Sequence, residues 1–287
     1  MSPNAIAIIG GSGLYDLGGL ASVHEETVDT PYGAPSSPVT IGEAAGRRVM
    51  FLARHGQGHR FTPSEVNYRA NIFALKALGA TEVVSVSAVG SMREEIRPGD
   101  IVLPDQYIDR TKGRPSTFFG GGIVGHVGFA DPTCAELTDR LCAAARAAGH
   151  AVRRGGTLMV MEGPAFSTRA ESRMHRQLGV DLIGMTAVPE AKLAREAELC
   201  YATVALATDY DCWHETEDDV TVEAVVAVMQ RNVASARALL RALVEMPPRA
   251  ERLCQCATAL EHAIITARSA IPADAKQRMT PIFGRVL

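Results

Sequence analysis

The chain has 287 residues, of which 47% are hydrophobic and 21% charged, and its formal net charge is -3 at pH 7. This composition is typical of a globular protein that is long enough to bury one large core. Its basic residues are scattered, which argues against a nucleic-acid groove or binding to an anionic membrane. No segment reaches the roughly 18 apolar residues of a membrane helix, and the N-terminus lacks the basic and apolar regions of a signal peptide. We therefore expect a cytoplasmic protein with a single domain over residues 1–287, in which residues from about 249 form a helical extension.

Short apolar runs that end in polar or glycine-rich clusters predict buried strands along the chain. These runs are residues 5–9, 49–53, 83–86, 157–161 and 201–207. Between them, helical spacing of apolar residues predicts helices. Ligands of such alternating α/β chains bind beyond the carboxyl ends of the strands, where the polar clusters fall here.

The predicted helices begin and end at recognisable signals. A capping box at Thr62–Glu65, with Pro63 at the first helical position, predicts a helix that ends before Gly79. Asp131-Pro132 predicts a second helix, and a long helix from about Thr221 ends at Pro247-Pro248. The long helix is expected to bury one apolar face, which includes Val222, Val225, Met229, Val233, Ala236, Leu240 and Leu243. A last helix is predicted to carry Leu253, Ala257, Leu260 and Ile264.

The first strand leads into Gly10-Gly11-Ser12-Gly13, whose backbone N–H groups and hydroxyl suit a phosphate oxygen. A plain tight turn explains the same residues equally well. Glu25 and Glu26 follow at a spacing that a dinucleotide site would use, but the third glycine of that fingerprint is missing. Leu14 stands where a hydrolase nucleophile elbow needs glycine, which excludes that motif.

Arg54-His55 follows another strand and offers a guanidinium fork that could clamp phosphate with two N–H groups. A surface ion pair beside a structural histidine is the alternative. His55 and His59 have the spacing of metal ligands on a helix, but Gly56 and Gly58 argue against a helix there. The sequence therefore predicts no metal site.

Asp209 and Asp211 flank Tyr210 at the end of an apolar strand. Two carboxylates close together near apolar surroundings raise at least one pKa, which favours proton donation. Two solvated loop acids are the other interpretation.

The six cysteines have irregular spacings that match neither a disulfide framework nor a zinc motif. Most are interpreted as core thiols. Cys254 and Cys256 are close enough in sequence to form a strained, reducible disulfide, although two free thiols are the favoured interpretation.

Several ordered motifs over residues 5 to 245 resemble the methylthioadenosine phosphorylases. They are Ile8–Leu14, Arg54–Gly56, Val66–Asn71, Arg93–Val102, Glu162–Pro164, Met185–Glu190 and Ala207–Trp213. The resemblance implies a single-domain α/β fold of the purine nucleoside phosphorylase type, with a twisted mixed β-sheet that forms a partial barrel flanked by helices. It also implies a homotrimer or a dimer of trimers, with a nucleoside and inorganic phosphate as substrates and no cofactor.

The resemblance assigns roles to residues at the matching positions. Phosphate would be held by Ser12, Arg54, His55, Ser87, the Ala88 backbone and Thr186. Met185 would contact the ribose, Phe166 would pack on the base, and Asp209 and Asp211 would face its N7 and amino edge. Val222 and Val225, with His126 from a neighbouring subunit, would line the 5′ pocket. Gly184 stands where asparagine is common, and the similarity fades beyond Pro248.

The expected reaction is phosphorolysis of 5′-methylthioadenosine to adenine and 5-methylthioribose 1-phosphate, a step of methionine and purine salvage, with Asp209 as the general acid. The alternative is a phosphorylase for adenosine, inosine, guanosine or methylthioinosine. The two acids argue against the 6-oxopurines, because a carboxylate accepts from an amino group but repels an oxygen. A binding protein without turnover, or a dinucleotide oxidoreductase, is the rival from another class.

Overall fold

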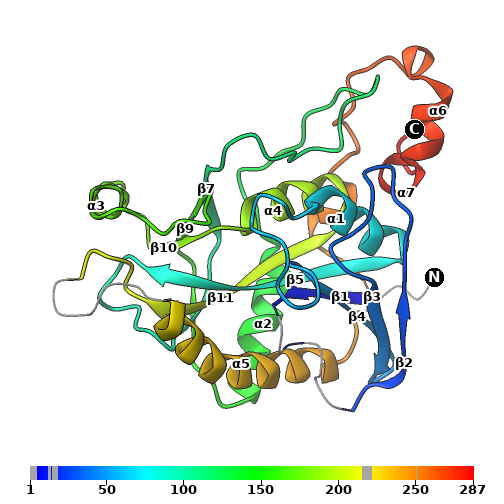
Figure 1. Cartoon of the computed structure of the whole chain (residues 1–287). Coiled ribbons are helices and arrows are strands. Elements are labelled where there is room, and N and C mark those ends of the chain that lie inside the picture. The colour runs from blue at the N-terminus through cyan, green and yellow to red at the C-terminus, as the bar shows by residue number, and fades with distance from the viewer. Residues whose placement is uncertain (1–4, 12–13, 15–18, 215–221, 250) are drawn as a thin grey trace.

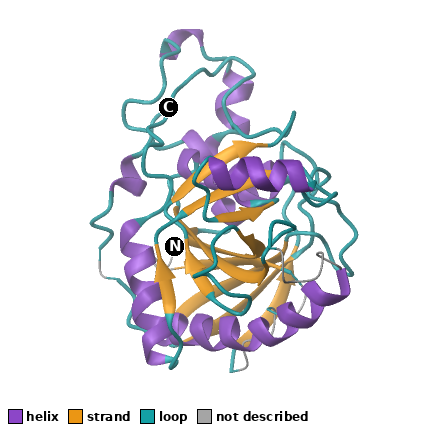
Figure 2. Ribbon diagram, turned by 90° about the vertical axis from the view of Figure 1, so that its left-hand side faces the viewer, coloured by secondary structure: helices purple, strands orange, loops and turns teal. Residues whose placement is uncertain are grey.

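The computed structural model describes residues 5–11, 14, 19–214, 222–249 and 251–287. Its strands form one mixed sheet (Figures 1 and 2). The strands are β1 (Ala5–Gly10), β2 (Ala21–Glu26), β3 (Val39–Ala44), β4 (Arg47–Ala53), β5 (Ala80–Ser91), β6 (Ile101–Leu103), β7 (Gln106–Arg110), β8 (Val152–Arg154), β9 (Thr157–Met161), β10 (Leu182–Gly184) and β11 (Cys200–Asp209).

The sheet branches at β5, which is its longest strand. One path runs in the order β2-β3-β4-β1-β5-β10-β9-β7, and β11 leaves it by pairing with β5 and then with β6, which pairs with β8. Strands β1 and β11 run parallel to β5, whereas β10 pairs antiparallel with its last residues. The α/β fold with a twisted mixed sheet, predicted from the resemblance, is confirmed. The five strands predicted from apolar runs are also confirmed: β9 has the predicted bounds, β1, β4 and β11 are longer by one to three residues, and β5 extends well beyond residues 83–86.

Helices cover both faces of this sheet (Figure 1). α1 (Tyr68–Ala77) and α4 (Ala187–Glu196) lie on one face, and α2 (Ala135–Ala147) and α5 (Val222–Glu245) lie on the other. Strand β1 is buried along its whole length because successive side chains point to opposite faces and both faces are covered. Ala5, Ala7 and Ile9 enter the core under α1 and α4, while Ile6 and Ile8 enter the core under α2 and α5.

The first predicted helix begins later than the sequence indicated. Only half of the predicted capping box forms: the Thr62 N–H donates to the Glu65 carboxylate, but the Thr62 hydroxyl also donates to it, and the Glu65 N–H donates to the Thr62 carbonyl. These contacts close a turn and not a helix. Helix α1 begins at Tyr68, because the Asn67 side chain caps it by accepting from the Ala70 N–H. The second helix likewise begins at Ala135, with Cys134 as its N-cap.

Helix α3 (Arg169–Gln177) and helix α4 were not predicted. Helix α3 has a complete capping box between Thr168 and Glu171, a signal that the sequence does contain. Helix α4 begins at Thr186 without a side-chain cap and carries Pro189 in its first turn. Pro is well tolerated there, because the first turn has no intrahelical partner for its N–H groups.

The predicted last helix is wrong. The chain forms short 3₁₀ turns, η1 (Gln255–Thr258) and η2 (Arg268–Ala270), followed by α6 (Ala273–Arg278) and α7 (Thr280–Phe283). Backbone groups of this region bond to other parts of the chain: the Leu260 N–H donates to the Glu198 carboxylate and the Ile265 N–H donates to the Val124 carbonyl. Long-range partners have therefore replaced the bonds of a continuous helix, and Leu253 is 81% exposed.

The chain after α5 shares the cores of the main sheet. Cys256 packs in the core under α2 and α5, and Leu260 and Phe283 pack in the core under α1 and α4. The division into one domain over residues 1–287 stays a prediction, which this shared packing supports. Among the described residues, no helix combines the length and apolar character that a membrane crossing requires.

Candidate active site

A cavity of about 460 Å³ lies where β1, β4, β5, β10 and β11 end. It brings together most of the residues that the sequence singled out: Arg54, His55, Ser87, Ala88, Phe166, Met185, Thr186, Asp209, Asp211 and Val225. The parallel strands of the sheet deliver these residues to one edge, as expected for a sheet of this type.

Three predicted site residues are not placed in the cavity. Ser12 lies outside the described residues. Val222, at the first turn of α5, is 62% exposed and does not line the cavity, so its predicted burial is wrong. His126 lines a separate surface hollow beside Phe119 and Phe129. Because the structure contains one chain, the proposed contribution of His126 to a neighbouring subunit stays a prediction.

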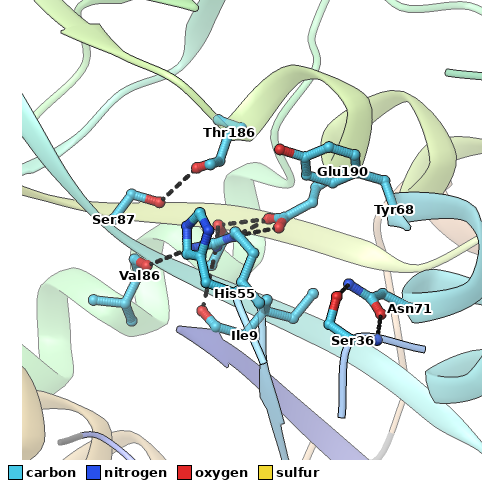
Figure 3. Close-up of polar contacts among 12 residues, drawn as sticks. Ile9, Ser36, His55, Tyr68, Asn71, Val86, Ser87, Thr186 and Glu190 are labelled. Atoms are coloured by element: carbon cyan, nitrogen blue, oxygen red, sulfur yellow. Dashed lines mark hydrogen bonds and ion pairs between the residues drawn. The ribbon is translucent and has the colours of Figure 1, made fainter. Parts of the chain in front are cut away.

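The guanidinium group of Arg54 forms a buried ion pair with Glu190 of α4, drawn in Figure 3. The Arg54 Nε donates to one carboxylate oxygen at 2.5 Å and Nη2 donates to the other at 3.1 Å. Ser85 and Tyr201 also donate to Glu190 through their hydroxyl groups, at 2.8 and 3.1 Å. Burial alone would lower the pKa of Arg54, but Glu190 raises it above its usual value, so the guanidinium stays charged.

The remaining contacts of Arg54 determine what it can offer a ligand. Its Nη1 donates to the Val86 carbonyl at 3.0 Å, and Nη2 donates to the Ser85 hydroxyl at 2.7 Å. A guanidinium has five N–H groups, and these contacts occupy four of them within the described part of the chain. In this arrangement a single N–H of Nη1 is left for an anion, so the two-point clamp stays a prediction that these contacts do not support.

His55 is a neutral hydrogen-bonding group at this end of the cavity. Burial and the adjacent Arg54 charge lower its pKa to about 4. Its Nδ1 lies 2.8 Å from the Phe61 carbonyl oxygen. Because a carbonyl only accepts, Nδ1 carries the proton, and Nε2 is left as an acceptor.

Hydroxyl groups and a helix terminus complete the polar end of the cavity. The Ser87 and Thr186 hydroxyls lie 3.2 Å apart. A dashed line joins them in Figure 3. Thr186 is the N-cap of α4, so the positive end of the helix dipole points into the same region. Gly11 also lines the cavity. One guanidinium N–H, two hydroxyls and a helix N-terminus form a site for a small oxyanion.

Asp209 lies at the other end of the cavity. Its carboxylate accepts from the Thr208 hydroxyl at 2.7 Å and from the Asp211 N–H at 2.8 Å. Burial raises the pKa of Asp209, with a smaller contribution from the Asp211 charge, and these two hydrogen bonds oppose the shift. The upward pKa shift agrees with the prediction, but burial contributes more to it than the charge of Asp211 does. A Cβ at Gly90 would lie 2.9 Å from the Asp209 carboxylate, so glycine makes room for this acid.

Asp211 lines the cavity, but one of its carboxylate oxygens is buried behind the surface. The residue is 7% exposed, and its Oδ2 has no hydrogen-bond partner among the described residues. A buried acceptor without a partner is costly, so a donor group that reached this oxygen would bind favourably. Asp211 also has a positive φ of 52°, a conformation that Asp and Asn tolerate better than most residues.

Met185 is held between these two ends. A Cβ at Gly163 would lie 2.5 Å from the Met185 sulfur, and Gly163 has a φ of 67°, so both backbone conformation and close approach require glycine there. Arg114 donates to the Met185 carbonyl at 2.5 Å and to the Glu162 carbonyl. These contacts fix the loop that carries Met185.

Sequence reasoning missed the supporting residues Glu190, Ser85 and Arg114. Glu190 lies within one of the motifs that carry the family resemblance, so a signal existed, but one charged residue in a helix that carries several identifies no partner. Ser85 and Arg114 have no local signal.

The fold and this cavity define a phosphorylase of the nucleoside-cleaving type. Residues 5–245 match the model of the phosphorylase superfamily. The S-methyl-5′-thioadenosine phosphorylase of Geobacter sulfurreducens is 59% identical over 280 residues, covering 97% of this chain and 98% of the relative. That of Koribacter versatilis is 54% identical, covering 98% and 96%.

Solved structures agree. A methylthioadenosine phosphorylase from an antarctic soil metagenomic library has a TM-score of 0.89 at 48% identity, covering 98% of this chain and 99% of that one. The Schistosoma mansoni methylthioadenosine phosphorylase in complex with adenine has a TM-score of 0.83 at 36% identity, covering 93% and 99%. The chain belongs to the phosphorylase superfamily and, within it, to the S-methyl-5′-thioadenosine phosphorylases.

Glu190→Gln is expected to destabilise the protein by about 3–5 kcal/mol, because it leaves the buried Arg54 charge without its counterion. The measurement is the free energy of unfolding in urea. Lys192→Gln is the matched control on the same helix, since Lys192 pairs with Asp109 near the surface and such pairs contribute about 0–1 kcal/mol. Equal losses in the two variants would show that the buried pair has no special role.

Proposed function

We propose that the protein catalyses the phosphate-dependent cleavage of 5′-methylthioadenosine to adenine and 5-methylthioribose 1-phosphate. The observation that carries the proposal is one cavity with an oxyanion site at Arg54, Ser87 and Thr186 and a protonatable acid, Asp209, at its other end. The names of the relatives, which cover nearly all of this chain, support the same reaction.

The acid end of the cavity fits the leaving base. As the glycosidic bond breaks, the departing adenine gains negative charge, and a proton from Asp209 to N7 stabilises it. We propose that the carboxylate of Asp211, which lines the same cavity, accepts from the amino group of adenine. A 6-oxopurine would direct an oxygen at this carboxylate. Such a mismatch lowers kcat/KM for the mismatched substrate by as much as about 10⁴–10⁵-fold.

The oxyanion end fits hydrogen phosphate. Arg54 offers one N–H, Ser87 and Thr186 offer hydroxyls, and we propose that Ser12 and the Ala88 backbone add further donors. The acceptor Nε2 of neutral His55 suits the remaining P–O–H group. Phosphate held in this way attacks the sugar carbon as the base leaves, and its orientation is the main contribution of the protein. Neither step needs a metal or a cofactor.

The remaining contacts select the nucleoside. We propose that Met185 packs on the ribose and that Phe166, which is 44% exposed at the cavity, packs on the base. Val225 and Met229 of α5 bring apolar side chains to the cavity, which suits a methylthio group better than a 5′-hydroxyl. Val222, which the resemblance assigns to this pocket, does not line the cavity of its own chain.

We further propose that the protein works in the cytoplasm, in methionine and purine salvage, as a homotrimer or a dimer of trimers. In such an assembly His126 of a neighbouring subunit would reach the 5′ pocket. The position of His126 away from the cavity of its own chain is consistent with that role.

The direct test is adenine release from 5′-methylthioadenosine, measured by chromatography with and without phosphate, beside adenosine, inosine and methylthioinosine. We expect fast adenine release that requires phosphate, and little or no cleavage of the oxopurine substrates. Preference for the oxopurines would mean that the protein is a 6-oxopurine phosphorylase, and absence of turnover on every substrate would favour a binding protein.

Asp209→Asn is expected to keep the fold and to lower kcat by roughly 10²–10⁴-fold, because the leaving base loses its proton donor. Burial raises the pKa of Asp209, so its acid form persists below that pKa and is lost as the pH rises through it. The ratio of wild-type to variant kcat/KM should therefore fall as the pH rises. Phosphate ionisation affects both proteins alike, so a ratio that does not change with pH would contradict the acid role.

Val225→Asp is expected to shift preference from methylthioadenosine toward adenosine, because a carboxylate accepts from a 5′-hydroxyl and disfavours a thioether. The ratio of the two kcat/KM values should change by roughly 10–200-fold, as for other single-group changes in apolar pockets. Val222→Asp, one turn earlier on α5 and outside the cavity, is the matched control. A larger shift in the control would place the 5′ pocket at the start of the helix.

A further inference from the structure

Four of the six cysteines meet at one buried place in the fold, which their irregular spacing in the sequence did not indicate. The sulfur atoms of Cys134, Cys200, Cys254 and Cys256 all lie within 4.8 Å of one another. All four are free thiols, three are buried and Cys254 is partly buried. None lines the active-site cavity. We call this group the cysteine cluster.

Three separate segments supply the cysteine cluster. Cys134 is the N-cap of α2, Cys200 is the first residue of β11, and Cys254 and Cys256 flank the start of η1. The backbone also joins the first two segments, since the Cys134 N–H donates to the Tyr201 carbonyl at 2.8 Å. The four thiols are therefore carried by the start of a helix, a strand and a 3₁₀ turn.

The spacing of the cluster matches a tetrahedral metal site. Zinc binds thiolate sulfur at about 2.3 Å, so four sulfurs around one ion lie about 3.8 Å apart. The Cys200 and Cys254 sulfurs are 3.4 Å apart, and the largest separation in the cluster is within 4.8 Å. No pair of sulfurs therefore has to close by more than about 1 Å to reach that distance.

The charges beside the cluster suit an anionic site. The Arg249 Nη2 lies 3.4 Å from the Cys200 sulfur, and its Nε has no acceptor among the described residues. Arg249 also pairs with Glu82 and Glu136, and Glu82 pairs in addition with Arg47 and Arg140. These three cations and two anions carry a net charge of +1, whereas four thiolates around Zn²⁺ carry -2.

We propose that Cys134, Cys200, Cys254 and Cys256 bind one structural zinc ion. Each thiol loses its proton as its sulfur–zinc bond forms, so four protons leave to solvent, and the oxidation state of zinc does not change. Four protein ligands close the coordination shell, which is typical of structural and not of catalytic zinc.

The site joins the C-terminal segment to the body of the fold. Cys254 and Cys256 belong to the chain that follows α5, whereas Cys134 and Cys200 belong to the main sheet and its helices. Cys200 and Asp209 begin and end β11, so the cluster lies about 30 Å from the catalytic acid at the usual rise per residue of a strand. The ion therefore stabilises the fold and takes no part in the reaction.

The test is the metal content of the untagged full-length chain, expressed with zinc, dialysed and analysed by plasma mass spectrometry. About one zinc per chain is expected for the wild type and for the Cys142→Ser control, since Cys142 is outside the cluster. Cys256→Ser is expected to lose most of that zinc. Zinc retained in Cys256→Ser, or a wild type that holds none after zinc titration, would overturn the proposal.

A second measurement needs no variant, in case Cys256→Ser fails to fold. Cobalt titrated into the reduced, metal-free wild type should give the thiolate-to-cobalt charge-transfer absorption of a four-sulfur site, and zinc should abolish it. Absence of that absorption overturns the proposal. So does an intact mass that is lower by two or four hydrogens, because it would show that the cluster forms disulfides. These readouts do not depend on the catalytic activity.

Discussion

The buried pair between Arg54 and Glu190 organises the anion end of the active site. It joins the end of β4 to α4, and Ser85 of β5 bonds to both partners. Because four of the five guanidinium N–H groups are used inside the protein, Arg54 is fixed before any ligand arrives. The same pair fixes α4, whose first residues carry the Thr186 hydroxyl. Preorganised donors of this kind need no rearrangement when charge develops on a reacting group.

Strand β5 connects the two ends of the site. Its residues from Val86 to Gly90 line the cavity between the oxyanion site and Asp209. It is also the strand at which the sheet branches, because β1, β10 and β11 all pair with it. The distance between the proposed oxyanion site and Asp209 is therefore determined by one continuous strand in the centre of the core, and not by two loops that could move independently.

The sequence predicted the parts of this arrangement that depend on local patterns. Apolar runs such as 5–9 identified the strands because β1 is buried on both faces, and Asp209 and Asp211 were recognised because they follow such a run. Contacts between distant segments were not predictable. Glu190 gives no local sign that it neutralises Arg54. The segment after Pro248 forms no long helix because its backbone groups bond to distant partners such as Glu198. The spacing of Cys134, Cys200 and Cys254 contains no metal motif.

The left-handed backbone at Asp211 restricts which residues can replace it over evolution, and so restricts changes in its proposed contact with the base. With a φ of 52°, the position disfavours β-branched and bulky side chains whatever they would contact. Asparagine shares the tolerance of aspartate for this conformation and replaces an acceptor by a donor of the same shape. A single nucleotide change in an aspartate codon therefore gives access to the opposite hydrogen-bonding character without backbone strain, whereas almost every other substitution at Asp211 also disturbs the turn that supports Asp209.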